Sequence, residues 1–337
     1  MKKTAVIILN WNGAALLREY LPSVVANTNP VLADVIVADN GSTDDSLRVL
    51  ADEFPQVTVL PFDKNYGFAE GYNRALEATG YPYTVLLNSD VAVRPGWVDA
   101  LVAYMDSHPD VGACQPKILS HADPQKFEYA GACGGYIDRN GYPYCRGRIF
   151  DTCEQDEGQY DGVADIFWAS GAALMVRTDV YLRLGGLDPA FFAHMEEIDL
   201  CWRMLLDGRR LSAVPSSVVE HLGGGSLPAG NPRKTYLNFR NNLLMLHKNL
   251  PDGSRSRTLL RRRLLDAVAW ARFVVAFDFA NAGAVLKAHR DFRRMRRQYT
   301  VHPQRDVLSE RADCRRNIIV DYYLRGRKKF SQLLSKK

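Results

Sequence analysis

The 337-residue sequence predicts an α/β fold, in which helices flank a mainly parallel sheet and a basic helical C-terminal region follows. Three observations lead to this prediction. Short apolar runs alternate with helical patterns over the first hundred residues, polar clusters follow the ends of these runs, and the charge changes sign near residue 250. Residues 251–337 contain 22 Lys and Arg against 8 Asp and Glu, a net charge of +14, whereas residues 1–250 carry −9.

The elements alternate regularly along the chain. Apolar runs predict strands at Ala5–Leu9, Asp34–Ala38, Val57–Leu60, Tyr83–Leu87, Ile166–Val176, Leu211–Val214 and Val218–Val219. Helical patterns lie at 14–26, 44–53, 68–79, 96–106, 196–207 and 233–249. Such alternation favours parallel strands joined by right-handed crossovers. Residues 120–165 are rich in Gly, Tyr, Cys and Asp with little periodicity, which indicates loops and a β-ribbon over a cleft.

Composition excludes several classes of protein. A hydrophobic content of 47% and a charged content of 24% are ordinary for a globular domain. The N-terminal apolar run stops at Asn10, too early for a secretory signal, and the stretch 264–286 is broken by Asp266, Arg272 and Asp278, so it cannot span a membrane. The six cysteines form no C-x-x-C pair, and we expect free thiols in a reducing cytoplasm.

Polar clusters end three of the predicted strands. They are the segments Asn10–Gly13 (N-W-N-G), Asp39–Ser42 (D-N-G-S) and Asn88–Asp90 (N-S-D). Ligands of open α/β sheets bind at the carboxyl ends of the strands, so these clusters predict a nucleotide site. One such cluster is equally consistent with helix caps and turns, whereas three at the same edge favour the site.

The order of these motifs resembles that of glycosyltransferase family 2. The matching segments are V-I-I-L-N-W-N-G, V-A-D-N-G-S-T-D-D-S, N-Y-G-F-A-E-G-Y-N-R-A-L, L-L-N-S-D-V-A-V, F-W-A-S-G-A-A-L-M-V, G-G-L-D-P-A-F-F and E-E-I-D-L-C-W-R, across roughly residues 4–245. The resemblance implies the GT-A fold, with a nucleotide-binding half at 1–115, an acceptor half at 116–250 and the helical region at 251–337. It implies inverting transfer from a nucleotide-diphosphate sugar to a saccharide acceptor, lipid-linked, in cell-surface polysaccharide synthesis.

The resemblance also assigns donor-binding and metal-binding residues. The donor-binding positions are Asn10, Asn12, Asp39, Asn65, Gly67, Asn73, Asn88 and Asp90. Asp39 matches the carboxylate that contacts the nucleoside, where it can accept the N3–H of uracil or thymine. Asp90 matches the last acid of an Asp-x-Asp metal motif whose first acid is Asn88 here. His221, before Gly223-Gly224-Gly225, completes the site for Mg²⁺ or Mn²⁺, which prefer oxygen ligands and take several from the diphosphate.

Glu197 matches the family's catalytic base. The family usually has Glu-Asp where this chain has Glu196-Glu197, and the second acid takes the proton of the acceptor hydroxyl. The extra methylene of Glu moves the carboxylate by about 1.5 Å. The alternative is that these acids only complement the dipole of the helix that follows. Asp199 and Arg203, four residues apart, form a helix ion pair or belong to the site.

Two further groups have alternative interpretations. Trp168 is either a platform on which an acceptor sugar stacks or a core residue. Arg233, Lys234 and Arg240 either bind a diphosphate or form a solvated basic face.

The C-terminal region predicts docking on the inner face of the cytoplasmic membrane. Residues 264–286 mix apolar runs with a few charges, and arginines flank them at 261–263 and 290–297. The alternative is a helical subdomain packed on the catalytic core. The tail lacks aromatic interleaving and a nucleic-acid motif, so we expect no nucleic-acid partner.

Two other functions compete with glycosyl transfer. A sugar-nucleotide nucleotidyltransferase would need basic residues after the first strand, and residues 10–15 contain none. A catalytically degenerate sugar-nucleotide-binding protein is consistent with the departures at Asn88 and Glu197.

Overall fold

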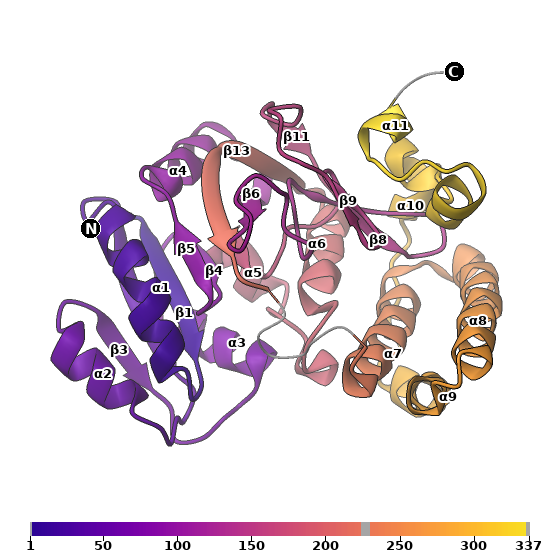
Figure 1. Cartoon of the computed structure of the whole chain (residues 1–337), viewed down its shortest axis with the longest axis horizontal. Helices are drawn as coiled ribbons and strands as arrows, with labels where there is room; N and C mark the ends of the chain where they lie inside the picture. The colour runs from indigo at the N-terminus through magenta and orange to yellow at the C-terminus, as the bar shows by residue number, and fades with distance from the viewer. Residues whose placement is uncertain (1, 224–229, 335–337) are drawn as a thin grey trace.

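A mixed sheet of nine strands lies at the centre of the described residues, which are 2–223 and 230–334 of this computed structural model. The strand order is β11-β13-β6-β12-β4-β1-β2-β3, and β5 pairs with β13 (Figure 1). The pairs β1–β2, β1–β4, β2–β3 and β6–β13 are parallel, whereas β12 runs antiparallel to both β4 and β6. The carboxyl ends of β1, β2 and β4 therefore meet at one edge.

The strands of this sheet are short and mostly buried. Their bounds are β1 Thr4–Asn10, β2 Ala33–Asp39, β3 Thr58–Pro61, β4 Tyr83–Leu87, β5 Val91–Val93, β6 Val111–Ser120, β11 Ala164–Asp165, β12 Ala173–Arg177 and β13 Arg210–His221. A second, antiparallel sheet consists of β7 Gly135–Ile137, β8 Pro143–Cys145, β9 Arg148–Ile149 and β10 Thr152–Cys153.

Helices connect and cover the strands. The first six are α1 Ala14–Asn27, α2 Ser46–Glu53, α3 Phe68–Thr79, α4 Trp97–Ser107, α5 Thr178–Arg183 and α6 Glu196–Leu206. The last five are α7 Pro232–Asn249, α8 Asp252–Val275, α9 Phe279–Met295, α10 Val307–Glu310 and α11 Ser331–Leu334. Short 3₁₀ turns lie at Pro189–Phe191, Arg296–Gln298 and Ala312–Arg315, and a π-helical turn lies at Val320–Leu324.

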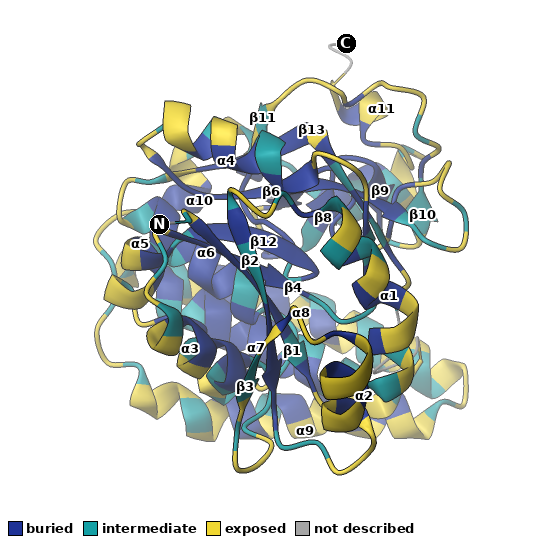
Figure 2. Cartoon of the chain, turned by 90° about the vertical axis from the view of Figure 1, so that its left-hand side faces the viewer, coloured by how far each residue is buried: buried dark blue, intermediate teal, exposed yellow. Residues whose placement is uncertain are grey.

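Burial explains why the strands read as continuous apolar runs. Helices lie on both faces of the sheet, so the side chains on both faces of β1 and β4 are buried. Figure 2 shows the strands in dark blue behind helices whose outer surfaces are yellow. One core cluster includes Ile7 and Trp202, and another includes Val6 and Trp97. All six cysteines are free thiols.

Two strand predictions need correction. The predicted strand Ile166–Val176 is wrong in its first half, because β12 begins only at Ala173. The chain turns just before it, where Ala173 N donates to Ser170 O at 3.2 Å. The two runs Leu211–Val214 and Val218–Val219 belong to one strand, β13, whose pairing with β6 shifts register between them. The unpatterned segment 120–165 contains the small antiparallel sheet rather than a single ribbon.

The end of the chain completes the small sheet. The backbone N–H of Ile318 donates to Asp138 Oδ2 at 3.1 Å, and that of Phe330 donates to Glu154 Oε1 at 2.7 Å. Both carboxylates are buried, and burial raises the pKa of Asp138. Residues 318 and 330 therefore supply additional donors to the two buried carboxylates that border the small sheet.

Helices α8 and α9 pack against each other and against α7, beside the sheet (Figure 1). Across the described residues, no helix combines the length and the apolar character that crossing a membrane requires. The division of the chain into 1–250 and 251–337 stays a prediction.

Candidate active site

The ends of β1 and β2 form the first part of the site. Register places Asn10 directly beside Asp39, and Asn10 Nδ2 donates to Asp39 Oδ1 at 3.0 Å. The backbone N–H of Ser42 donates to Asp39 Oδ2 at 3.0 Å. Asp39 is only 1% exposed, so these bonds hold its carboxylate rigidly at the strand edge.

The neighbouring loops carry the other predicted donor-binding residues. Asn12 Oδ1 accepts from the backbone N–H of Thr43 at 2.7 Å. Asn65 Oδ1 accepts from the backbone N–H of Gly67 at 2.7 Å and from Asn40 Nδ2 at 3.1 Å. The structure thus brings the predicted residues Asn10, Asn12, Asp39, Asn65 and Gly67 to the loops after β1, β2 and β3.

The second part of the site is a pair of residues from β13 and the β4–β5 turn. His221 is the last residue of β13 and pairs with Val91, the residue after Asp90. His221 Nε2 lies 3.2 Å from Asp90 Oδ1 and 3.5 Å from Asn88 Nδ2. On its other side, His221 Nδ1 lies 3.4 Å from Glu128 Oε2. Glu128 was missed by the sequence reading, because it lies in the segment without periodicity.

The electrostatics of this pair are strongly coupled. Burial alone would lower the pKa of His221, but hydrogen bonds to Asp90 and Glu128 and their negative charges raise it to about 10. Burial alone would raise the pKa of Asp90, and the neighbouring His221 holds it below the usual value. A protonated imidazole must lose its proton before it can bind a cation.

Asp90 and His221 could bind a divalent cation only if a bound nucleotide sugar supplied further oxygen ligands. Asp90 Oδ1 and His221 Nε2 point at each other and could share one ion, and the diphosphate of a donor could supply further oxygens. Within residues 2–223 and 230–334, no group of three or more His, Cys, Asp or Glu side chains is arranged to hold a metal by itself. Gly223 lies beside Glu128, and the predicted Gly224 and Gly225 lie outside the described residues.

The third part of the site is the loop 190–195 and the start of α6. Phe192, His194 and Met195 have φ values of 67°, 68° and 74°, a conformation that residues other than glycine rarely adopt. Three such residues in one loop mark stored strain, which persists only where the surroundings enforce it. Glu196 and Glu197 follow at once, in the first turn of α6.

The two glutamates are chemically distinct. Burial raises the pKa of Glu197 to about 7, although backbone N–H groups at the start of α6 partly oppose this. Burial and the charge of Glu197 raise the pKa of Glu196 well above its usual range, which favours its neutral form. Glu197 is half-buried and Glu196 is buried. Glu197 also lies beside Gly171, since a Cβ added there would be 3.8 Å from Glu197 Cβ.

Helix α7 enforces the strained loop. Asn241 Nδ2 lies at hydrogen-bond distance from three backbone carbonyls, of Phe191 at 2.9 Å, Ala193 at 2.8 Å and His194 at 2.7 Å. Arg240 Nη2 donates to the carbonyls of Ala190 at 3.0 Å and Phe191 at 2.8 Å. Asn241 was missed by the sequence reading, since only the folded chain brings these segments together.

Three predicted ligand contacts need correction. Trp168 is 3% exposed, donates to Tyr136 O at 2.9 Å and packs on Gly135, so it is a core residue and no sugar can stack on it. The amide of Asn73 is occupied by the backbone of Leu187, at 2.8 and 2.9 Å, and by a tyrosine hydroxyl. The guanidinium of Arg240 is directed to the loop carbonyls described above.

The acid at position 199 also has a structural role. Asp199 is fully buried and receives Arg203 at 2.9 Å, Lys248 at 2.9 Å and Asn249 at 2.7 Å. Burial alone would raise the pKa of Asp199, but these partners lower it. The interpretation as an ion pair within helix α6 is therefore the better one, extended by α7.

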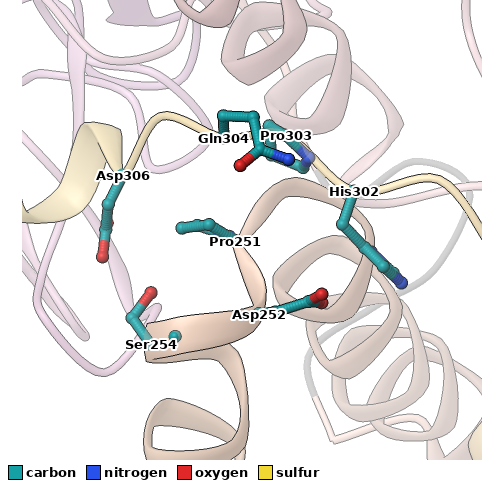
Figure 3. A pocket seen from close by; sticks show the side chains of 8 residues that line it. Pro251, Asp252, Ser254, His302, Pro303, Gln304 and Asp306 are labelled. Carbon is teal, nitrogen blue, oxygen red and sulfur yellow. The ribbon is translucent and has the colours of Figure 1, made fainter.

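Two cavities lie outside the strand edge. One of about 380 Å³ lies between the start of α8 and the segment 302–306, lined by Asp252, His302 and Asp306 (Figure 3), and it contains no predicted site residue. The other, of about 610 Å³, lies between α7 and α9 and includes Phe192 and Arg240.

Part of the chain is similar in sequence to known glycosyltransferases. A family model described as Glycosyl transferase family 2 matches residues 5–141. An N-acetylglucosaminyl-diphospho-decaprenol L-rhamnosyltransferase of Mycobacterium tuberculosis is 29% identical over 235 residues, which is 64% of this chain and 75% of the relative.

Solved structures share the fold. A mannosyltransferase from Pyrobaculum calidifontis in complex with GDP-Man and Mn²⁺ has a TM-score of 0.53 and 16% identity, covering 88% of this chain and 84% of that one. GalNAc-T7 with UDP, GalNAc and Mn²⁺ has a TM-score of 0.57 and 16% identity, covering 75% of this chain but 49% of that one, so this chain spans about half its length. These matches define a glycosyltransferase of the GT-A fold. Residues 5–141 match glycosyltransferase family 2, in agreement with the predicted family, and the solved structures confirm the predicted GT-A fold.

We predict that Asn241→Leu loosens the loop 190–195. The carbonyls of Ala193 and His194 would lose the Asn241 amide, while that of Phe191 would keep Arg240, at a cost of about 2–4 kcal/mol in the free energy of unfolding. In native buffer, chymotrypsin should then cleave faster after Phe191 and Phe192. The control is Asn249→Leu on the same helix, which also removes a buried amide but does not contact this loop. Equal cleavage in both variants would show that Asn241 does not hold the loop.

Proposed function

We propose that this chain transfers a sugar, with inversion, from a nucleotide-diphosphate donor to a saccharide acceptor carried on a lipid. The observation that carries the proposal is Glu197, a carboxylate with a pKa of about 7 at the start of α6, in a chain whose strand ends also bring Asp39, Asp90 and His221 to the site. A base with this pKa is half deprotonated at neutral pH and still strong enough to take a hydroxyl proton.

Each part of the strand edge has a role in this proposal. Asp39 and Asn10 receive the nucleoside, and Asn12, Asn65 and Gly67 line the loops around it. Only 1% of Asp39 is exposed, so contact with the base would run through the edge of its carboxylate. Exposed Trp11, between Asn10 and Asn12, offers an aromatic face at the same loop.

Asp90 and His221 would hold the Mg²⁺ or Mn²⁺, with Asn88 beside them. The ion would stabilise the negative charge of the departing diphosphate as a Lewis acid. Two of the solved structures of similar fold contain Mn²⁺, which supports this assignment. Glu128 would accept the Nδ1 proton of His221 and fix the orientation of its ring.

We predict that transfer requires a divalent cation. Excess chelator should abolish it, and added Mn²⁺ or Mg²⁺ should restore it. Asp90→Ala and His221→Ala should each lower kcat by about 10²–10³-fold, because the leaving diphosphate loses its electrostatic partner. His302→Ala, in the separate cavity of Figure 3, is the control and should keep its activity. Full activity in excess chelator would remove the metal from the mechanism.

We predict that Glu197, not Glu196, is the general base. Glu197→Gln should slow transfer by about 10²–10⁴-fold with little change in donor affinity. The base acts when deprotonated, so kcat/KM of the wild-type chain should rise as the pH increases through about 7 and then level off. Glu196→Gln is the matched control, because burial and the charge of Glu197 favour the neutral form of Glu196, which a neutral amide reproduces.

The anomeric configuration of the product tests the mechanism independently. One displacement by a hydroxyl inverts the anomeric carbon, so NMR should show the opposite configuration to that of the donor. Retention would contradict direct displacement. A chain that binds donor nucleotide but neither hydrolyses nor transfers the sugar would instead be a catalytically degenerate binding protein.

The acceptor class rests on a relative and on a surface. The mycobacterial relative is named for an acceptor with a diphospho-decaprenol group. Helix α8 exposes an apolar stripe at Leu260, Leu264, Val268 and Val275, spaced so that all four lie along one side of the helix. Phe277 and Phe279 are exposed where α8 turns into α9. Helices α8 and α9 both pack against α7. They therefore combine a face that is packed on the rest of the chain with an apolar face that is exposed.

Positive charge flanks this stripe. Exposed arginines at 261, 290 and 294 would lie near an anionic leaflet, and each cation there contributes about 1 kcal/mol. We therefore propose that α8 and α9 dock the chain on the inner face of the cytoplasmic membrane.

We predict salt-dependent binding to anionic vesicles. The full-length chain should sediment with vesicles containing phosphatidylglycerol at low salt and be released at high salt. The double variant Leu264→Glu/Val268→Glu should remain in the supernatant, because two carboxylates would enter the interface. The control is Val31→Glu, which changes an exposed apolar residue distant in sequence from α8 and should bind normally. A full-length chain that ignores these vesicles at low salt would show that the stripe has another purpose.

A further inference from the structure

The cavity of about 610 Å³ between α7 and α9 has a chemical character that the strand edge does not explain. Three cationic side chains line it: Arg233 and Arg240 from α7, and Lys287 from α9. Phe192 and Tyr236 supply aromatic walls, with Arg233 5.0 Å from the ring of Phe192 and Lys287 4.9 Å from that of Tyr236.

The positive charge of this cavity is not neutralised. Within the described part of the chain, neither Arg233 nor Lys287 forms an ion pair with a carboxylate. Asp291, which accepts from the hydroxyl of the cavity residue Tyr236 at 2.9 Å, is itself flanked by Arg290 and Arg294. An anion with several oxygens would therefore be attracted to the space between Arg233 and Lys287.

The cavity is open because α9 carries small residues there. Ala280, Gly283 and Ala284 line it, and a Cβ added at Gly283 would meet no atom within 4 Å. Exposed Phe279 and Leu286 lie next to Gly283 on the helix surface, four residues before it and three after it. The cavity therefore opens beside an apolar surface.

The opposite wall leads to the proposed base. Phe192 lies against Gly67 of the donor-binding loop, since a Cβ added at Gly67 would be 3.6 Å from the Phe192 ring. Phe192 also belongs to the strained loop that precedes Glu197. One side of the cavity thus faces the reaction site, its middle is cationic, and its other side is apolar.

We propose that this cavity binds the diphosphate of a prenyl-diphosphate-linked saccharide, with Arg233 and Lys287 holding the phosphates. The saccharide would extend past Phe192 to Glu197, and the prenyl chain would leave along Phe279 and Leu286 to the membrane. This inference rests on the proposed function and adds to it a site for the acceptor. Arg240 also lines this cavity, and it holds the loop 190–195 that carries Phe192.

Binding of farnesyl diphosphate to the full-length chain tests the site without catalysis. Arg233→Glu, Lys287→Glu and Gly283→Trp should each weaken this binding by roughly tenfold or more, the first two by repelling the phosphates and the third by filling the cavity. Affinity for UDP should not change. Inorganic diphosphate should compete with farnesyl diphosphate, and farnesol should compete poorly.

Two matched controls separate the cavity from general effects. Arg297→Glu makes the same change of charge in the turn after α9, outside the cavity, and Gly253→Trp adds the same side chain at another helical glycine with open space around it. Both should bind farnesyl diphosphate normally. The proposal is overturned if the wild-type chain does not bind farnesyl diphosphate at millimolar concentration, or if these controls lose as much affinity as the cavity variants.

The same measurements distinguish this proposal from its premise. Loss of UDP affinity in step with farnesyl diphosphate would assign the cationic cavity to the donor and overturn the acceptor assignment. If the binding pattern holds but no sugar is transferred or hydrolysed by any variant or by the wild type, the proposed transferase function is wrong and the diphosphate site stands.

Discussion

Side chains of helix α7 bind most of the backbone carbonyls of the loop 190–195, and the rest of the site depends on these bonds. Arg240 and Asn241 donate to four of the five carbonyls at 190–194, all but that of Phe192. One turn or two further along, Lys248 and Asn249 reach Asp199 of α6. Helix α7 therefore fixes both the strained entry to α6 and the helix itself, and the proposed base stands between these two attachments.

The surroundings of each carboxylate at the start of α6 determine its pKa. Glu196 and Glu197 are adjacent, yet they differ: burial raises the pKa of Glu197 to about 7 against the opposing backbone N–H groups, whereas burial and the charge of Glu197 together raise the pKa of Glu196 well above its usual range. Asp199 is equally enclosed but stays ionised because Arg203 and Lys248 surround it. The proposed base thus differs from its neighbours by environment alone.

Much of the fold followed from the sequence, and the reasons are local. The predicted strand Tyr83–Leu87 and the predicted helix 68–79 have the same ends as β4 and α3, because the apolar run and the helical pattern each stop abruptly in the sequence. The strand-end cluster of Asn10 and Asp39 was predictable because parallel strands place their ends at one edge.

What could not be predicted depends on contacts distant in sequence. Burial of Trp168 against Gly135 and the orientation of Arg240 toward a loop fifty residues away leave no periodic trace. Glu128 lies in a segment with no pattern, and the pairing that brings it to His221 is visible only in the folded chain.

The contacts between the small sheet and residues 318–330 also affect the order in which the chain can fold during synthesis. Asp138 and Glu154 emerge early from the ribosome, but the N–H groups of Ile318 and Phe330 emerge nearly two hundred residues later in synthesis. Until those residues are synthesised, the two acids have only the donors near the small sheet, among them the N–H groups of Asn140 and Tyr142 and the hydroxyl of Tyr160, so the nascent sheet forms with its two border carboxylates incompletely bonded.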